Sequence, residues 1–205
     1  MQADLQTRSV SPTLERVSTV LRFAGWSGFW VQLGLAIATA ILLVFAITGR
    51  SFSRAVAPPP GIGVVGVDQG GTPGLGVGMF WAVCGIAALL VSVYLAFRQT
   101  RYAKRLRHPD AAVHPKKAEV MQLVRLGVIV GLIGMLVTIL GGGVTLSVLL
   151  AKSISQPQGV AIYDPTRFIR SLDIFIALAN MNGIAAHFLG TVASLGLLNW
   201  LRACK

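Results

Sequence analysis

The sequence predicts an all-α integral membrane protein with four transmembrane helices. The 205-residue chain is 54% hydrophobic, has a mean hydropathy of +0.71 and contains only 12% charged residues. Its apolar residues form four long runs, and an α-helix needs about 20 such residues to cross a bilayer. The charged residues cluster between these runs, which is typical of a membrane protein and not of a soluble domain.

The composition also excludes several classes of function. The net charge of +11 does not indicate nucleic-acid binding, because the basic residues flank apolar segments and mark membrane topology. We therefore expect the lipid bilayer, and no nucleic acid, as a partner. An enzyme is not expected, since no HExxH motif and no nucleophile and base at a recognisable spacing occur.

Residues 1–25 are predicted to be a polar N-terminal tail. Ser11 and Pro12 are suited to begin a short helix with one apolar face. This helix either lies on the membrane surface or belongs to an ordinary polar tail. The tail has neither the apolar region of a signal peptide nor the composition of a transit peptide.

The four-helix transmembrane domain is expected to cover residues 26–201, with a first span at about 28–48. Trp26 and Trp30 would anchor this span at the membrane interface. Residues 49–78 read as a Pro/Gly-rich external loop. Its glycines do not form a phosphate-binding loop, because the Gly-Lys-Ser/Thr ending and a strand-to-helix context are lacking.

The second span, at about 79–97, leads into a basic cytoplasmic loop at 98–125. Three arginines lie on one side of the helical turns that continue this span, and they are predicted to contact anionic lipid headgroups: Arg98, Arg101 and Arg105. The alternative is a solvated topology determinant with no specific ligand.

Small residues recur at steps of three and four along the third span, at about 126–150. Such residues form a groove that another helix can approach closely. Gly141 to Gly143 either pack in this way, which we favour, or bend the helix. The glycines expected to pack in the third and fourth spans are Gly127, Gly131, Gly134, Gly141, Gly183 and Gly190. The polar segment 151–170 would connect the two spans.

The fourth span, at about 172–201, carries unusually polar residues. Asp173, Asn180 and His187 fall seven residues apart, so on a helix they form one slowly drifting stripe, with Asn182 nearby. Thirteen of the 18 Lys and Arg residues lie in the tail, the basic loop and the C-terminal end. This distribution predicts that both termini lie on the cytoplasmic or stromal side.

The fourth-span string LDIF…N…AHFLG…SLGLL resembles a four-span family of chloroplast inner-envelope proteins and their cyanobacterial relatives. The resemblance covers about Phe29 to Leu201 and includes Asp173, Asn182, His187 and Gly190. The family has been described both as an iron permease and as a component of the Tic protein-import translocon. Lacking a transit peptide, the chain is expected to be cyanobacterial-type, in the plasma or thylakoid membrane. Its plant relatives would lie in the chloroplast inner envelope.

Polar groups inside a membrane raise a functional hypothesis. In the first hypothesis, Asp173, Asn180, Asn182 and His187 line a transport path or metal site of a homo-oligomeric permease, with iron as cargo. In the alternative, the protein is a structural or accessory subunit whose partners are other membrane proteins, as in a translocon or photosynthetic complex. As a third interpretation, His187 ligates chlorophyll. No cofactor is otherwise expected.

Overall fold

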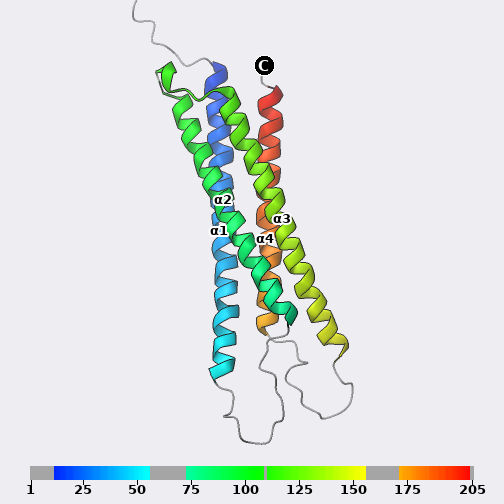
Figure 1. Cartoon of the computed structure of the whole chain (residues 1–205). Helices are drawn as coiled ribbons and strands as arrows, with labels where there is room; N and C mark the ends of the chain where they lie inside the picture. The colour runs from blue at the N-terminus through cyan, green and yellow to red at the C-terminus, as the bar shows by residue number, and fades with distance from the viewer. Residues whose placement is uncertain (1–11, 56–72, 109, 156–170, 204–205) are drawn as a thin grey trace, which may run out of the picture. The chain divides into compact units, whose positions relative to one another are not determined.

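The computed structural model describes residues 12–55, 73–108, 110–155 and 171–203. The described residues form four α-helices and one short 3-10 helix: α1 Pro12–Ala55, α2 Pro73–Leu106, η1 Ala111–Val113, α3 Lys117–Ile154 and α4 Ser171–Ala203 (Figure 1). All four α-helices are long and apolar enough to cross a membrane. The predicted fold class is therefore confirmed. The side of the membrane on which the termini lie stays a prediction.

The helix ends differ from the predicted spans. Proline begins α1 and α2, because its fixed backbone angle suits the first helical position and no N–H is left unpaired there. α1 runs without a break to Ala55, so the described part of the predicted tail continues directly into the first span. Residues 1–11 of that tail, and residues 56–72 of the predicted external loop, lie outside the described residues.

α3 is also longer than the third predicted span. It continues through Gly141 to Gly143 and ends at Ile154. A helix tolerates interior glycines, each of which costs about 1 kcal/mol relative to alanine. Lys152, in the segment that was predicted to connect two spans, therefore belongs to α3.

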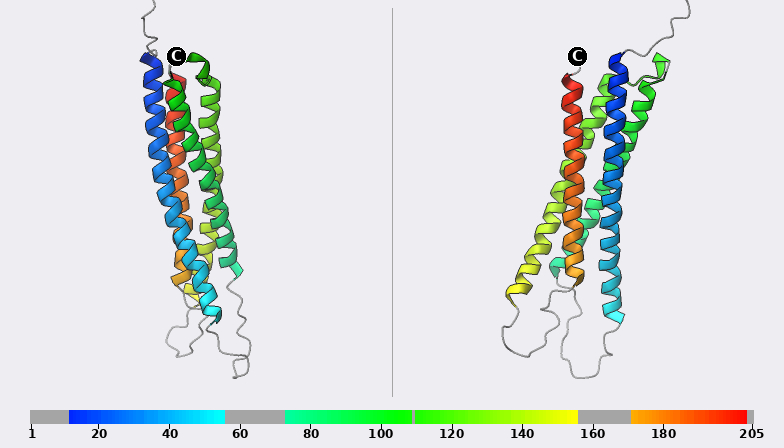
Figure 2. Two further views of the ribbon diagram at one scale, coloured as in Figure 1. Left: turned by 90° about the vertical axis from the view of Figure 1, so that its left-hand side faces the viewer. Right: turned by 180° about the vertical axis from the view of Figure 1, so that it is seen from behind.

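The chain divides into two compact units, and each α-helix contributes a segment to both. Unit 1 comprises Met1–Gly34, Ala88–Ile133 and Ala186–Lys205, and unit 2 comprises Leu35–Ala87 and Gly134–Ala185. Unit 1 holds the starts of α1 and α3 and the ends of α2 and α4, whereas unit 2 holds the opposite ends (Figure 2). Helices that are consecutive in sequence therefore run antiparallel within each unit.

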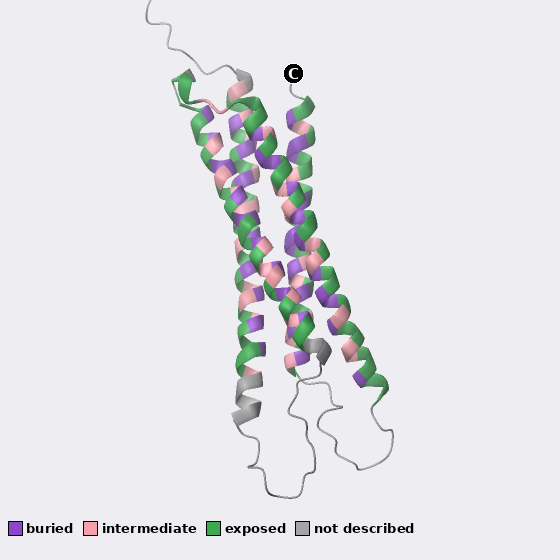
Figure 3. Cartoon of the chain, in the orientation of Figure 1, coloured by how far each residue is buried: buried purple, intermediate pink, exposed green. Residues whose placement is uncertain are grey.

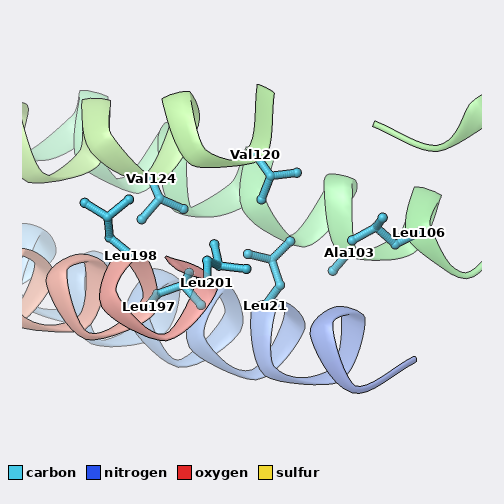
Figure 4. Close-up of a cluster of buried hydrophobic side chains, with 8 residues drawn as sticks. All are labelled: Leu21, Ala103, Leu106, Val120, Val124, Leu197, Leu198 and Leu201. Carbon is cyan, nitrogen blue, oxygen red and sulfur yellow. The ribbon is translucent and has the colours of Figure 1, made fainter. Parts of the chain in front are cut away.

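An apolar cluster built from all four helices forms the core of unit 1. Its eight buried side chains are shown in Figure 4: Leu21, Ala103, Leu106, Val120, Val124, Leu197, Leu198 and Leu201. Beside it, the Ser18 hydroxyl donates a hydrogen bond of 2.8 Å to the Ala103 carbonyl. Arg107 Nε donates to the same hydroxyl oxygen at 3.0 Å. These bonds join α1 to the end of α2.

Unit 2 packs through small residues. Thr138 of α3 is buried and lies against Gly85 of α2 and Gly183 of α4. A Cβ added at Gly183 would lie only 2.8 Å from Thr138 Cγ2, and one at Gly85 would also collide with that methyl group. The Thr138 hydroxyl donates to the Gly134 carbonyl of its own helix at 2.9 Å. The two glycines therefore create the space that this threonine fills.

Exposed residues occur along all four α-helices (Figure 3), and many of them are large and apolar. Phe23 in unit 1 is 77% exposed, and Ile154 in unit 2 is 76% exposed. Apolar surface on this scale is unfavourable in water, but lipid acyl chains can cover it. The exposed faces agree with a protein that lies in a bilayer.

We expect Gly183→Ala to destabilise the protein by about 1–3 kcal/mol, the usual cost of overpacking. Adding Thr138→Ser should restore most of this loss, because serine lacks Cγ2 but keeps the hydroxyl that binds Gly134. Thermal unfolding in detergent micelles would measure both effects. Gly143→Ala is the matched control, since nothing lies within 4 Å of a Cβ added there. Equal melting temperatures for the two alanine variants would contradict this packing.

Candidate functional site

The polar residues predicted in the fourth span all lie on α4, and the structure places them in different surroundings. Asp173 and Asn180 are buried in unit 2, where Asn182 is half-buried. His187 is completely buried in unit 1. We describe each unit separately.

In unit 2, Asp173 forms an ion pair with Lys152 near the end of α3. Lys152 Nζ donates a hydrogen bond of 2.6 Å to Asp173 Oδ2. The side chains are 9% and 5% exposed, respectively. A buried charge needs a partner of opposite sign, because the loss of water is otherwise uncompensated. The ammonium group thus neutralises the only carboxylate of the predicted stripe.

Lys152 is a site residue that the sequence analysis missed. The sequence does contain a signal for it, because Gly131, Thr138, Thr145 and Lys152 fall seven residues apart. All four are buried. This spacing on α3 matches the spacing of Asp173, Asn180 and His187 on α4, and it would have placed Lys152 on the inner face of a longer helix.

Asn180 and Asn182 bind backbone groups of other helices within unit 2. Asn180 Nδ2 donates to the Ile176 carbonyl of α4 at 3.0 Å and to the Gly78 carbonyl of α2 at 3.4 Å. Asn182 Nδ2 donates to Leu35 O and to Thr39 Oγ1 of α1, both at 3.2 Å. Together with the ion pair, these bonds connect α4 to α1, α2 and α3.

Gly141 of α3 leaves the space that the Asn180 side chain occupies. A Cβ at Gly141 of α3 would lie 2.5 Å from Asn180 Oδ1 and 2.6 Å from Trp81 Cβ. Among the described residues, this oxygen has no hydrogen-bond partner. The amide oxygen of Asn180 therefore lies close to α3 but accepts no hydrogen bond from a described residue.

In unit 1, α4 packs against α1 and α3 through small residues. The hydroxyl of Thr191 donates to the His187 carbonyl at 2.7 Å, and Thr191 Oγ1 lies against Gly131 of α3. Gly190 lies against the carboxamide of Gln32 of α1. The His187 residue is 0% exposed. Ligation of chlorophyll by His187 stays a prediction.

Gly127 and Gly134, the remaining glycines of the packing prediction, both belong to α3. A Cβ at Gly127 would lie 3.2 Å from the Ser194 hydroxyl oxygen in unit 1. Gly134 is buried in unit 2 and accepts the hydrogen bond from Thr138. At these two positions α3 has no side chain beyond a hydrogen atom.

The three arginines predicted to contact lipid lie near the end of α2, in unit 1, and pair with aromatic rings of the same helix. The guanidinium groups of Arg98 and Arg105 lie 5.7 and 6.0 Å from the centre of the Tyr102 ring, and Arg101 lies 5.0 Å from the Phe97 ring. Arg98 Nη2 also donates to the Tyr102 hydroxyl at 3.1 Å. Contact with anionic lipid stays a prediction.

Within the part of the chain that the structure describes, no three His, Cys, Asp or Glu side chains are grouped so that they could hold a metal ion. The side chains of Asp173, Asn180 and Asn182 instead contact α3, α2 and α1 of the same unit. A metal ion at Asp173 would have to share the carboxylate with the ammonium group of Lys152 or displace it.

Comparison with known proteins gives one relative and one family. The chain is 34% identical, over 200 residues, to the Arabidopsis thaliana protein named "Protein TIC 21, chloroplastic". The alignment covers 92% of this chain and 59% of the relative, so the chain spans less than two thirds of that protein's length. No solved structure matches the chain.

The relative confirms the resemblance drawn from the fourth span, and the four apolar helices make the chain an integral membrane protein. Residues 11–202 match the family described as "Protein of unknown function (DUF3611)". Because this match extends over nearly all of the 205 residues, the chain belongs to the DUF3611 family.

Proposed function

We propose that the protein is a structural or accessory subunit of a membrane assembly. The observation that carries this proposal is the use of the α4 polar groups for contacts within the protomer. Asp173 binds α3, Asn180 binds α2 and Asn182 binds α1. These contacts of the polar face stabilise the protomer. The apolar outer faces then remain for contact with lipid and with partner helices.

The comparisons support the same type of function. The Arabidopsis relative is named "Protein TIC 21, chloroplastic". The family that the fourth span resembles has been described both as an iron permease and as a component of a protein-import translocon. We infer an assembly of that kind, or a photosynthetic complex. Its membrane would be the plasma or thylakoid membrane of a cyanobacterial-type cell, or the inner envelope in plants.

Metal-ion transport is the second candidate, because the fourth helix carries ionisable and polar residues. Ionisable residues inside a membrane are costly and often mark an ion pathway. Asp173 and Lys152 are buried ionisable residues near the ends of two helices that are long and apolar enough to cross a membrane. In this candidate function iron is the cargo, and Asp173 exchanges the ammonium group for the metal ion.

Purified protein, reconstituted alone into liposomes, should take up no more iron than protein-free liposomes. Gentle solubilisation of the source membrane should recover it with other membrane proteins, in a complex larger than the 21.7 kDa protomer. Native electrophoresis and mass spectrometry would identify the components.

Transport makes the opposite prediction for the same liposomes. Saturable uptake that is lost in His187→Ala, but kept in Phe188→Ala, would contradict the proposal. Phe188 is the matched control because it is the next residue and is 53% exposed. Recovery of a complex that contains only this chain would also count against an accessory subunit.

Replacing one member of the ion pair should be far worse than replacing both. Lys152→Met removes the ammonium partner of the buried Asp173 carboxylate, and we expect a loss of about 3–5 kcal/mol. The double variant Lys152→Met with Asp173→Leu should recover most of this stability, because no charge remains buried. Thermal unfolding of the purified variants would measure the difference.

The double variant also separates the two candidate functions. A subunit should still enter its native complex at the normal size, whereas a permease that uses Asp173 should lose uptake. Lys104→Met, at an exposed position of α2, controls for the loss of a positive charge. If Lys152→Met were as stable as Lys104→Met, the ion pair would not be buried as described.

A further inference from the structure

Four aromatic rings from two helices meet in unit 1, and neither candidate function uses them. On α1, Trp26 stacks on Phe29 with the ring centres 5.8 Å apart. Trp30 packs edge-on against both rings, at 5.8 and 5.5 Å. The Phe97 ring of α2 lies 6.1 Å from the Phe29 ring. We call these four residues the aromatic cluster.

Gly25 of α1 allows the two helices to approach closely enough for their rings to meet. A Cβ added at Gly25 would lie 3.1 Å from Thr100 Cγ2 and 3.2 Å from the Ala96 carbonyl oxygen, both of α2. Small residues allow such an approach of two backbones in a membrane. A larger residue at this position would push α2 away and separate Phe97 from Phe29.

The aromatic cluster is open on its outer side. Trp26 and Trp30 are 50% and 55% exposed, and Phe97 is 38% exposed. Tryptophan is common at the level of the lipid headgroups, because its ring is apolar and its N–H group is polar. The exposed rings therefore offer a surface on which the glycerol end of an acyl chain can pack.

Two arginines lie beyond the cluster on the same side. Arg101 follows Phe97 by one turn of α2, and its guanidinium group lies 5.0 Å from the centre of the Phe97 ring. Arg22 precedes Trp26 by one turn of α1. Because α1 and α2 run antiparallel in unit 1, one turn back along α1 and one turn forward along α2 lead to the same side of the cluster. Both arginines are exposed.

No carboxylate occupies these two arginines. Among the described residues, neither Arg22 nor Arg101 forms an ion pair. The described part of unit 1 contains eleven Lys and Arg residues but three Asp and Glu residues. Arg98 and Arg105 differ from Arg101, because both lie against the Tyr102 ring. Of the three arginines predicted to contact lipid, Arg101 is the one beside the aromatic cluster.

We propose that Arg22, Arg101 and the aromatic cluster form a binding site for one anionic glycerolipid. The guanidinium groups bind oxygens of its phosphate group, and the exposed tryptophan rings pack against its acyl chain. A guanidinium group has paired N–H donors that match phosphate oxygens. Arginine at the membrane surface also attracts anionic lipid. A zwitterionic lipid suits the site less, because it would bring an ammonium group to a strongly basic surface.

Native mass spectrometry of the full-length protein in detergent would test this site, with phosphatidylglycerol and phosphatidylcholine added in turn. The first phosphatidylglycerol molecule should bind about tenfold more tightly than the first phosphatidylcholine molecule. Arg22→Gln combined with Arg101→Gln should remove most of this difference. Equal affinities of the unmodified protein for the two lipids would overturn the proposal.

Arg16→Gln combined with Lys104→Gln is the matched control. This pair also removes two exposed positive charges from α1 and α2, but neither residue is next to the aromatic cluster by one helical turn. Phosphatidylglycerol binding should change little. If it weakens as much as in the Arg22 and Arg101 variant, the protein attracts lipid only through its overall charge and the proposal is wrong.

Trp26→Ala tests the aromatic part of the site. It should weaken phosphatidylglycerol binding severalfold, whereas Phe80→Ala should not, since Phe80 is 61% exposed but lies in unit 2. Equal effects of the two variants would contradict a role for the cluster. Glycerol 3-phosphate, which has the phosphate group but no acyl chain, should not displace the lipid at equal concentration. Displacement would indicate a site for phosphate and not for a lipid, and would also overturn the proposal.

Discussion

A polar group buried between helices is cut off from bulk water, so its burial is costly unless another group pairs with it. The ion pair between Lys152 and Asp173 is the strictest case, because either charge alone would cost several kcal/mol at a buried position. The pair joins α3 to α4. The neutral amides of Asn180 and Asn182 follow the same rule and reach α2 and α1. Packing in unit 2 therefore depends on pairing the polar face of α4.

Much of this arrangement could be predicted from the sequence, because the relevant signals are periodic. The four apolar runs predict the helices, and the seven-residue spacing of Asp173 and Asn180 predicts that they share a face. Lys152 was missed for a physical reason: a lysine after an apolar run normally marks a helix end and topology. Its pairing depends on how far α3 extends.

The pairing changes what Asp173 can do. A free carboxylate is a good ligand for iron, but Asp173 Oδ2 already accepts a hydrogen bond of 2.6 Å from Lys152 Nζ. This ammonium group is attached to α3. The tether gives Lys152 a high effective concentration, which a dilute metal ion would have to overcome. The Asp173 carboxylate therefore acts mainly to join α4 to α3. This argument favours a subunit of a membrane assembly over a permease that binds metal at this residue.

Arginines at and just beyond the end of α2, in unit 1, contact neighbouring aromatic rings and hydroxyl groups. Arg98 and Arg105 lie over the ring of Tyr102, and Arg107 binds Ser18 of α1. Aromatic rings and hydroxyl groups stabilise a guanidinium group without removing its charge. These side chains can therefore hold the helix ends in place and still attract an anionic surface. A basic segment that marks topology thus also contributes to packing.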